Sequence, residues 1–199
     1  MNKVICHMTH IDNLKDIIAM GGLQSKNSSS MPQYKSIANE NVQDKRSNRV
    51  VPIGAKGTLH DYVPFYFWGV TPMLLVNKYR QNDIIFLASQ TKMISDAAPP
   101  FVFTDRHAYI QYAKFYDDLS KLKELNWETI QNRYWESTQD DPDKMAKKQA
   151  EFLVYEKTPW SLISGIGVIN EEVAAKVHTI VGSQVHSPVI KIKKEWYYL

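Results

Sequence analysis

The sequence contains a single cysteine, Cys6, among its 199 residues. One thiol can form neither an internal disulfide nor a thiolate zinc cage, so a reducing compartment suits the chain. No stretch reaches the roughly 20 apolar residues that a membrane-spanning helix requires, and the first ten residues lack the apolar core of a signal peptide. We therefore expect a cytoplasmic protein with no membrane contact.

The common catalytic motifs are also missing. There is no Walker loop, no Rossmann glycine fingerprint, no H-E-x-x-H and no G-x-S-x-G. His7 and His10 lie three residues apart, but His7 falls in a predicted strand and no acid completes a ligand set, so no metal site is expected. Cys6 and His7 are neighbours on that strand and would point to opposite faces, which argues against thiol catalysis.

The composition is that of one globular domain. Hydrophobic residues make up 44% and charged residues 23%, while the aromatic share of 12% is high. The net charge of +3 is too small to establish a polyanionic partner, and charge alone leaves nucleic-acid binding and a solvated face both open. The basic residues cluster at Lys45, Arg46 and Arg49, at Lys144, Lys147 and Lys148, and at Lys191, Lys193 and Lys194.

Hydrophobic patterns predict strands and helices in an irregular order, which favours an α+β fold over a doubly wound sheet. Residues 24–48 form a long polar excursion, and long loops of this kind are often functional. Strands are predicted at 3–8, 50–53, 62–68, 84–88, 149–155, 166–169 and 189–192. Helices are predicted after a cap at Thr9 or Asp12, at 105–116, 127–135 and 171–181, and from Asp141 as N-cap with Pro142 at the first helical position.

The run QAEFLVY places one carboxylate, Glu151, at the start of an apolar strand. An ionised carboxylate is costly to bury unless it has a partner or a task. A lone acid is more often an edge-strand residue that faces water, so both interpretations stay open until companions are found. The polar candidates in apolar company are His7, Thr9 and Arg49.

The sequence resembles the DarT family of DNA ADP-ribosyltransferase toxins along nearly its whole length. The resemblance rests on CHMTHIDNL with GGL after it, RVVPIGAKGTLHDYVPFYF with TPML, FTDRHA, RYW, DPDKMAKKQAEFLVYEKTPW and GIGV. It implies one ADP-ribosyltransferase-like domain over residues 1–199, of the α+β class. In this fold a split antiparallel or mixed sheet is flanked by helices, residues 24–48 cover NAD, and residues 105–150 face the substrate.

The resemblance further implies the chemistry. NAD is the ADP-ribose donor, a thymidine base in single-stranded DNA is the acceptor, and modification of a specific sequence blocks replication. A macrodomain antitoxin (DarG-like) is the implied partner of a monomeric toxin. Arg49 and Glu151 are the implied catalytic residues, and the implied NAD contacts are His7, Met8, Thr9, Asp16, Gln24 and Arg49.

These residues suit the reaction. Glu151 can stabilise the oxocarbenium-like ribose, and Arg49 can assist thymine deprotonation or stabilise the resulting anion, although an arginine is a poor base. Phe65 or Tyr66 can stack on the nicotinamide ring or simply pack in the core. Gln149 lies two residues before Glu151 and can orient an acceptor or close a local turn. The expected DNA contacts are His107, Tyr109, Arg133, Lys147 and Lys148, a mixture of positive charge and flat rings.

Two alternatives remain. The same aromatic and basic residues could serve a non-catalytic module that binds single-stranded DNA without NAD. Within enzymes, an NAD-dependent transferase could act on guanine, RNA or protein.

Overall fold

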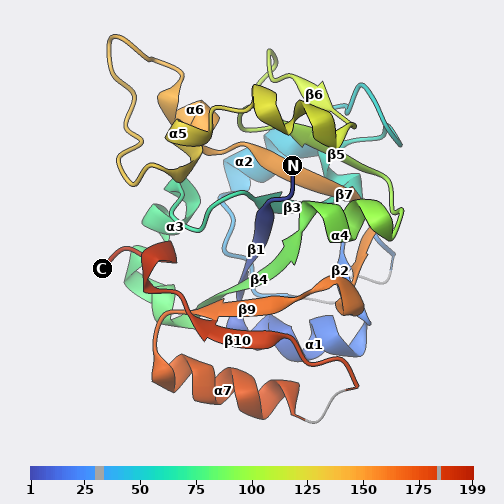
Figure 1. The fold of residues 1–199 in the computed structure, drawn as a ribbon, viewed down its shortest axis with the longest axis vertical. Coiled ribbons are helices and arrows are strands. Elements are labelled where there is room, and N and C mark those ends of the chain that lie inside the picture. Colours follow the sequence, from blue (N-terminus) through green and yellow to red (C-terminus); the bar gives the residue numbers. More distant parts are fainter. Residues whose placement is uncertain (30–33, 183–184) are drawn as a thin grey trace.

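The computed structural model describes residues 1–29, 34–182 and 185–199 (Figure 1). The strands are β1 (Val4–His10), β2 (Gly22–Gln24), β3 (Tyr62–Tyr66), β4 (Ile84–Gln90), β5 (Phe101–Thr104), β6 (Phe115–Tyr116), β7 (Glu151–Tyr155), β8 (Lys157–Pro159), β9 (Gly165–Val168) and β10 (Val189–Ile192). The helices are α1 (Leu14–Ala19), α2 (Glu40–Ser47), α3 (Pro72–Val76), α4 (Thr91–Asp96), α5 (Trp127–Gln131), α6 (Lys144–Lys148) and α7 (Glu171–Val181). Short 3-10 turns join several of them.

Eight strands form the main sheet in the order β10-β9-β4-β1-β3-β7-β5-β6, and β2 and β8 form a small second sheet. The β10 and β9 strands are parallel, whereas the other neighbours in the main sheet are antiparallel. Helix α7 runs beside β9 and β10 at one end of the molecule (Figure 1). The expected α+β class with a mixed sheet is confirmed.

The main sheet is nearly split between β1 and β3. Strand β4 pairs with β1 along all of Val4–His10, and β7 pairs with β3 along all of Tyr62–Tyr66. In contrast, β1 and β3 face each other at one pair, Cys6 and Tyr66. Pro64, in the middle of β3, has no N–H to donate to a ladder. The two halves of the sheet therefore separate beyond that pair, which leaves side chains of both strands free to line a cavity.

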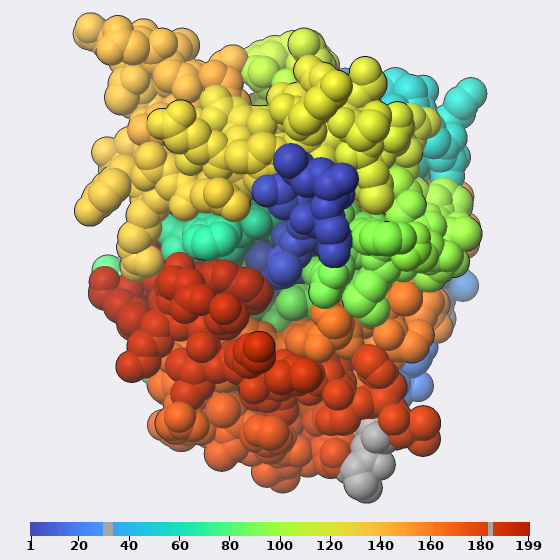
Figure 2. Space-filling model, in the orientation of Figure 1, coloured from blue at the N-terminus to red at the C-terminus, as the bar shows by residue number. Residues whose placement is uncertain are grey.

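The core closes around this sheet from both chain ends. Tyr197 is fully buried, and its hydroxyl donates to the carbonyl oxygens of Ile84 and Gly167 on two core strands. At the other end of the chain, the Lys3 ammonium lies 4.0 Å from the ring centroid of Trp127. Figure 2 shows the N-terminal residues in the centre of one face, with the C-terminal segment beside them. No helix in the described ranges is long and apolar enough to cross a membrane.

Several sequence predictions need correction. Residues 105–116 are turns followed by β6, because their amides bond to partners outside a helix: His107 N donates to the Ala146 carbonyl, and Lys114 N donates to Asp105. The stretch 50–53 contributes one bridge, Val50 to Thr58, since Pro52 cannot donate. The excursion 24–48 contains helix α2, and α6 begins at Lys144 with Asp143 as its N-cap, not Asp141.

Candidate active site

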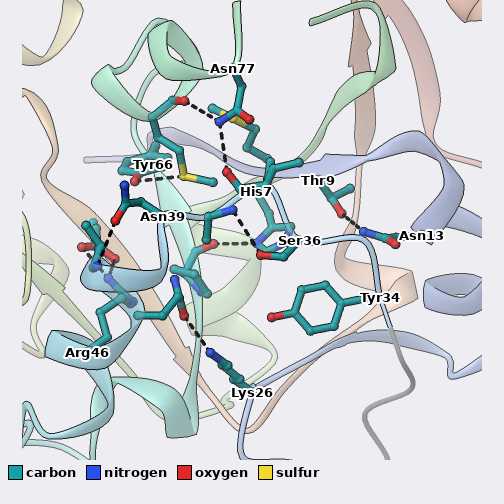
Figure 3. Close-up of a pocket in the computed structure, with 18 of the residues that line it drawn as sticks. His7, Thr9, Asn13, Lys26, Tyr34, Ser36, Asn39, Arg46, Tyr66 and Asn77 are labelled. Carbon is teal, nitrogen blue, oxygen red and sulfur yellow. Dashed lines mark hydrogen bonds and ion pairs between the residues drawn. The ribbon is translucent and has the colours of Figure 1, made fainter. Parts of the chain in front are cut away.

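A cavity of about 650 Å³ opens beside the divergent ends of β1 and β3. This volume is in the range of pockets that hold a whole cofactor or drug-sized ligand. Strand β1, helices α1 and α2 and residues 34–39 supply much of its lining, and Glu151 lies on its wall at the start of β7. Figure 3 shows side chains from these separate segments pointing toward the same space. Segments that are far apart in the sequence therefore meet around one cavity.

Glu151 is a buried residue of an interior strand, since β7 lies between β3 and β5 and the side chain is only 1% exposed. Nη1 of Arg46 donates to both carboxylate oxygens, at 2.9 and 2.7 Å. The Ala108 amide donates to Oε1 at 3.0 Å, and Nδ1 of His107 lies 2.9 Å from the same oxygen. The interpretation of Glu151 as an edge residue facing water is therefore wrong.

The surroundings of Glu151 keep it ionised. Burial alone raises the pKa of the carboxyl, but the Arg46 guanidinium, His107 and the Ala108 amide together outweigh burial and lower the pKa to about 2. At neutral pH the cavity thus contains a fixed negative charge that water hardly reaches. Such a group can stabilise positive charge that develops on a ligand.

The arginine at the carboxylate is Arg46 and not Arg49, which corrects the sequence-based assignment. Arg46 lies in the last turn of α2, which directs it inward, and its Nη2 is buried with no partner among the described residues (Figure 3). Arg49 follows the end of that helix and is not part of the cavity lining. Its guanidinium donates to the backbone carbonyls of Ala108, Ile110 and Gln111. Nη2 of Arg46 therefore has donor capacity that no described residue uses.

The β1 residues His7, Met8 and Thr9 all line the cavity. Nδ1 of His7 lies 2.7 Å from the Pro64 carbonyl oxygen, and because a carbonyl only accepts, this nitrogen carries the proton. Burial lowers the pKa of His7, so the ring is neutral and Nε2 remains an acceptor. The Thr9 hydroxyl accepts from Asn13. The strand thus offers the cavity an imidazole acceptor and a hydroxyl group.

Asp16 and Gln24 also line the cavity, as does the segment 34–39 from the expected NAD-covering loop. Asn13 bonds to both backbone groups of Lys35, and Nδ2 of Asn77 donates to the Ile37 carbonyl. These two side chains hold the segment across the cavity (Figure 3). Residues 30–33 of the same loop lie outside the described ranges. Sequence reasoning missed Asn13, because its partners Thr9 and Lys35 lie on a strand and in a distant loop segment.

The structure brings one of the five expected DNA contacts, His107, to the cavity. Tyr109 packs on His107 with ring centroids 4.3 Å apart, while Arg133 donates to the Tyr197 carbonyl and Lys147 pairs with Asp141. Lys148 is 1% exposed, and its ammonium donates to the carbonyls of Ile130 and Asn132. A buried ammonium cannot reach a phosphate, so Lys148 is removed from the list of DNA contacts.

The other candidate residues, Phe65, Tyr66 and Gln149, also differ in whether they line the cavity. Tyr66 lines the cavity, whereas Phe65 is fully buried in the core and cannot stack on a ligand. Gln149 also lines the cavity, and its Nε2 donates to the Met145 carbonyl, which closes a local turn. The described residues contain no group of three or more His, Cys, Asp or Glu side chains that could hold a metal ion.

Comparison with known proteins gives a match to one family over almost the whole chain. Residues 6–198 match the family model described as "ssDNA thymidine ADP-ribosyltransferase, DarT". The DNA ADP-ribosyl transferase of Thermus sp. (strain 2.9) is 43% identical over 98% of this chain and 95% of its own length.

Solved structures of relatives agree with this match. The Thermus sp. 2.9 DarT in complex with ADP-ribosylated ssDNA has a TM-score of 0.92 at 41% identity, covering 98% of this chain and 96% of that one. The same protein in complex with NAD⁺ has a TM-score of 0.89 at 40% identity, with 98% of each chain covered. Thermosipho africanus DarTG in complex with ADP-ribose has a TM-score of 0.80 at 20% identity, covering 99% of this chain and 51% of that one, a likeness of fold alone.

Proposed function

Because the chain belongs to the DarT family of DNA ADP-ribosyltransferases, we propose that it transfers ADP-ribose from NAD to a thymidine base in single-stranded DNA. The observation that carries this proposal is the buried pair of Glu151 and Arg46 on the wall of a cavity large enough for a dinucleotide. The relatives bound to NAD⁺ and to ADP-ribosylated DNA support the donor and the acceptor.

Glu151 acts on the sugar that is transferred. The bond between the ribose and nicotinamide breaks with its electron pair on the leaving nicotinamide, so positive charge grows on the ribose. The carboxylate, already ionised and screened from water, stabilises this charge and can accept a hydrogen bond from a ribose hydroxyl. Because its position is fixed before NAD binds, little reorganisation is needed at the transition state.

Arg46 acts on the acceptor or on the pyrophosphate. A thymine ring nitrogen forms the new bond to the ribose and gives up its proton to solvent water, so negative charge appears on the base as the proton leaves. The unpaired Nη2 of Arg46 can donate to that charge while Nη1 stays on Glu151. A guanidinium remains charged at neutral pH, so we assign it anion stabilisation and not proton removal.

The other cavity residues bind NAD in this proposal. His7 accepts through Nε2 and Thr9 contributes its hydroxyl, Met8 offers its backbone, and Asp16 and Gln24 complete the donor site. The resemblance implies that residues 24–48 cover NAD, and their described segment 34–39 lines the cavity. Residues 105–150 face the DNA, with His107 nearest to the target base.

We also propose, from the family, that the protein is a monomeric toxin whose modification blocks replication and is removed by a macrodomain antitoxin (DarG-like). A Thermosipho africanus DarTG protein, of which this chain covers 51%, shares the fold of this chain with a TM-score of 0.80.

The test is incubation with NAD and single-stranded oligonucleotides that differ in one base, followed by mass spectrometry. The proposal expects one ADP-ribose on oligonucleotides that contain thymidine, and loss of that product in Glu151→Ala and Arg46→Ala with DNA binding retained. Glu171→Ala, an exposed carboxylate on α7, is the matched control and should keep full activity. Modification of guanine, RNA or protein instead would refute the thymidine assignment, and DNA binding without any transfer would favour a non-catalytic module.

A further inference from the structure

Arg49 does not line the cavity, but hydrogen bonds connect it to the Glu151 carboxylate through one residue, Ala108. On the basis of the proposed function, we propose that Arg49 is a positioning residue that holds the turn 107–111 against Glu151 and so orders the acceptor side of the site.

The contacts define a clamp on the backbone. Nε of Arg49 donates to the Ala108 carbonyl at 3.4 Å, and Nη2 donates to the carbonyls of Ile110 and Gln111 at 3.2 and 2.9 Å. The guanidinium also lies 5.5 Å from the centroid of the Phe115 ring. Only the planar fork of an arginine can reach three carbonyls and stack on a ring at once, whereas the compact lysine ammonium cannot do both.

Ala108 transmits this clamp to the catalytic carboxylate. Its carbonyl accepts from Arg49, while its own amide donates to Oε1 of Glu151 at 3.0 Å. The preceding residue, His107, places its Nδ1 2.9 Å from the same oxygen and lines the cavity. A shift of the turn would therefore move two of the groups that face Glu151 without disturbing the pair of Glu151 with Arg46.

The opposite side of the turn has a separate anchor. Arg106 pairs with Asp143 at 2.8 Å, and the Tyr112 hydroxyl donates to the same carboxylate at 2.9 Å. These contacts fix the two ends of the turn to the residue that caps α6. The carbonyls of residues 108, 110 and 111 lie between the two ends and are held by Arg49. Loss of Arg49 should thus loosen the middle of the turn and leave its ends in place.

The experiment compares Arg49→Ala and Arg49→Lys with the wild-type protein in steady-state transfer from NAD to a thymidine oligonucleotide. Lys121→Ala removes an exposed cation outside the cavity lining and serves as the charge-matched control. We expect kcat to fall roughly 10- to 100-fold in Arg49→Ala, the loss typical of a displaced reacting group, with partial recovery in Arg49→Lys. KM for NAD should stay at the wild-type value, because the proposed donor contacts lie on β1, α1, β2 and residues 34–39, outside this turn.

Hydrogen exchange supplies a readout that a general loss of stability would not produce. The amides of residues 105–114 should exchange faster in Arg49→Ala while those of α7 keep the wild-type rate. Wild-type kcat in Arg49→Ala, or faster exchange throughout the chain, would overturn the positioning role. A rise in KM for NAD as large as the expected fall in kcat would overturn the positioning role too, since Arg49 would then serve the donor site. Failure of the wild-type protein to transfer ADP-ribose would refute the proposed function and not this inference, because exchange in the 105–114 turn can still be measured.

Discussion

Replacement of Arg46 by methionine tests the electrostatics of the site most directly. The substitution keeps the unbranched stem of the side chain, although it is shorter, and leaves the Glu151 carboxylate, 1% exposed, with only the Ala108 amide and His107. Removal of one partner of a buried ion pair typically costs about 3–5 kcal/mol, because the remaining charge stays desolvated. We expect the free energy of unfolding of Arg46→Met to fall by about that amount at neutral pH.

The pH dependence distinguishes this cause from simple loss of packing. In the wild-type protein the pKa of Glu151 is lowered from 4.5 to about 2. Its stabilising contribution, about 3 kcal/mol by linkage, is therefore present above 4.5 and is lost as the pH falls from there toward 2. Arg46→Met removes the group that lowers the pKa of Glu151 most strongly, and burial still raises it. The folded-state pKa of Glu151 in the variant therefore lies above that of the wild type. As the pH falls, Glu151 of the variant becomes protonated and no longer destabilises the folded state as an unpaired buried charge. The difference in the free energy of unfolding between the two proteins should therefore narrow.

Urea unfolding followed by tryptophan fluorescence, from neutral pH down to about pH 4, measures both effects. The control is the double variant Arg46→Met with Glu151→Gln, in which no carboxylate remains. It should be more stable at neutral pH than Arg46→Met and should lack the narrowing of the gap. A penalty in Arg46→Met that is equal at all pH values would show that packing, and not an unpaired charge, sets its size, and the reasoning would be refuted.

Three further outcomes follow from single contacts. Asn13→Ala removes the bonds to Lys35, so the cavity-spanning segment loosens, and KM for NAD should rise in steady-state assays while the unfolding free energy changes by only ~1 kcal/mol. The pKa of Lys148 is lowered by burial from 10.5 to about 8, so wild-type stability should gain relative to Lys148→Met as pH rises between these values, measured by urea unfolding. Gly22→Ala should prevent folding as judged by circular dichroism, because a Cβ there would lie 2.1 Å from the Thr158 carbonyl oxygen.

Elements with local signals could be predicted from the sequence. Helix α7 was predicted at its observed bounds because its apolar spacing is regular, Asn170 caps its first turn and Gly182 follows its last residue with φ of +55°. Strand β10 was likewise predicted at its observed bounds. Each of these signals lies within one turn or one strand of the residues it governs.

Elements that depend on distant partners could not be predicted in this way. Strand β5 has four residues next to two prolines, and it becomes an interior strand only because β7 and β6 pair with it. Residues 105–116 have apolar spacing compatible with a helix, but their amides are taken by Ala146 and Asp105. In both cases tertiary hydrogen bonds override the local pattern.

Local sequence patterns also cannot decide between Arg46 and Arg49 as the arginine that pairs with Glu151. Residues three apart share a face when a helix continues through both, so a basic run of this spacing offers two equivalent candidates. The equivalence ends because α2 stops at Ser47 and Asn48 is its C-cap. Arg46, inside the helix, turns toward Glu151, whereas Arg49, beyond it, turns toward the carbonyls of the neighbouring loop. In the proposed function, the end of one helix in a polar stretch thus assigns Arg46 to the chemistry and Arg49 to the support of the same carboxylate.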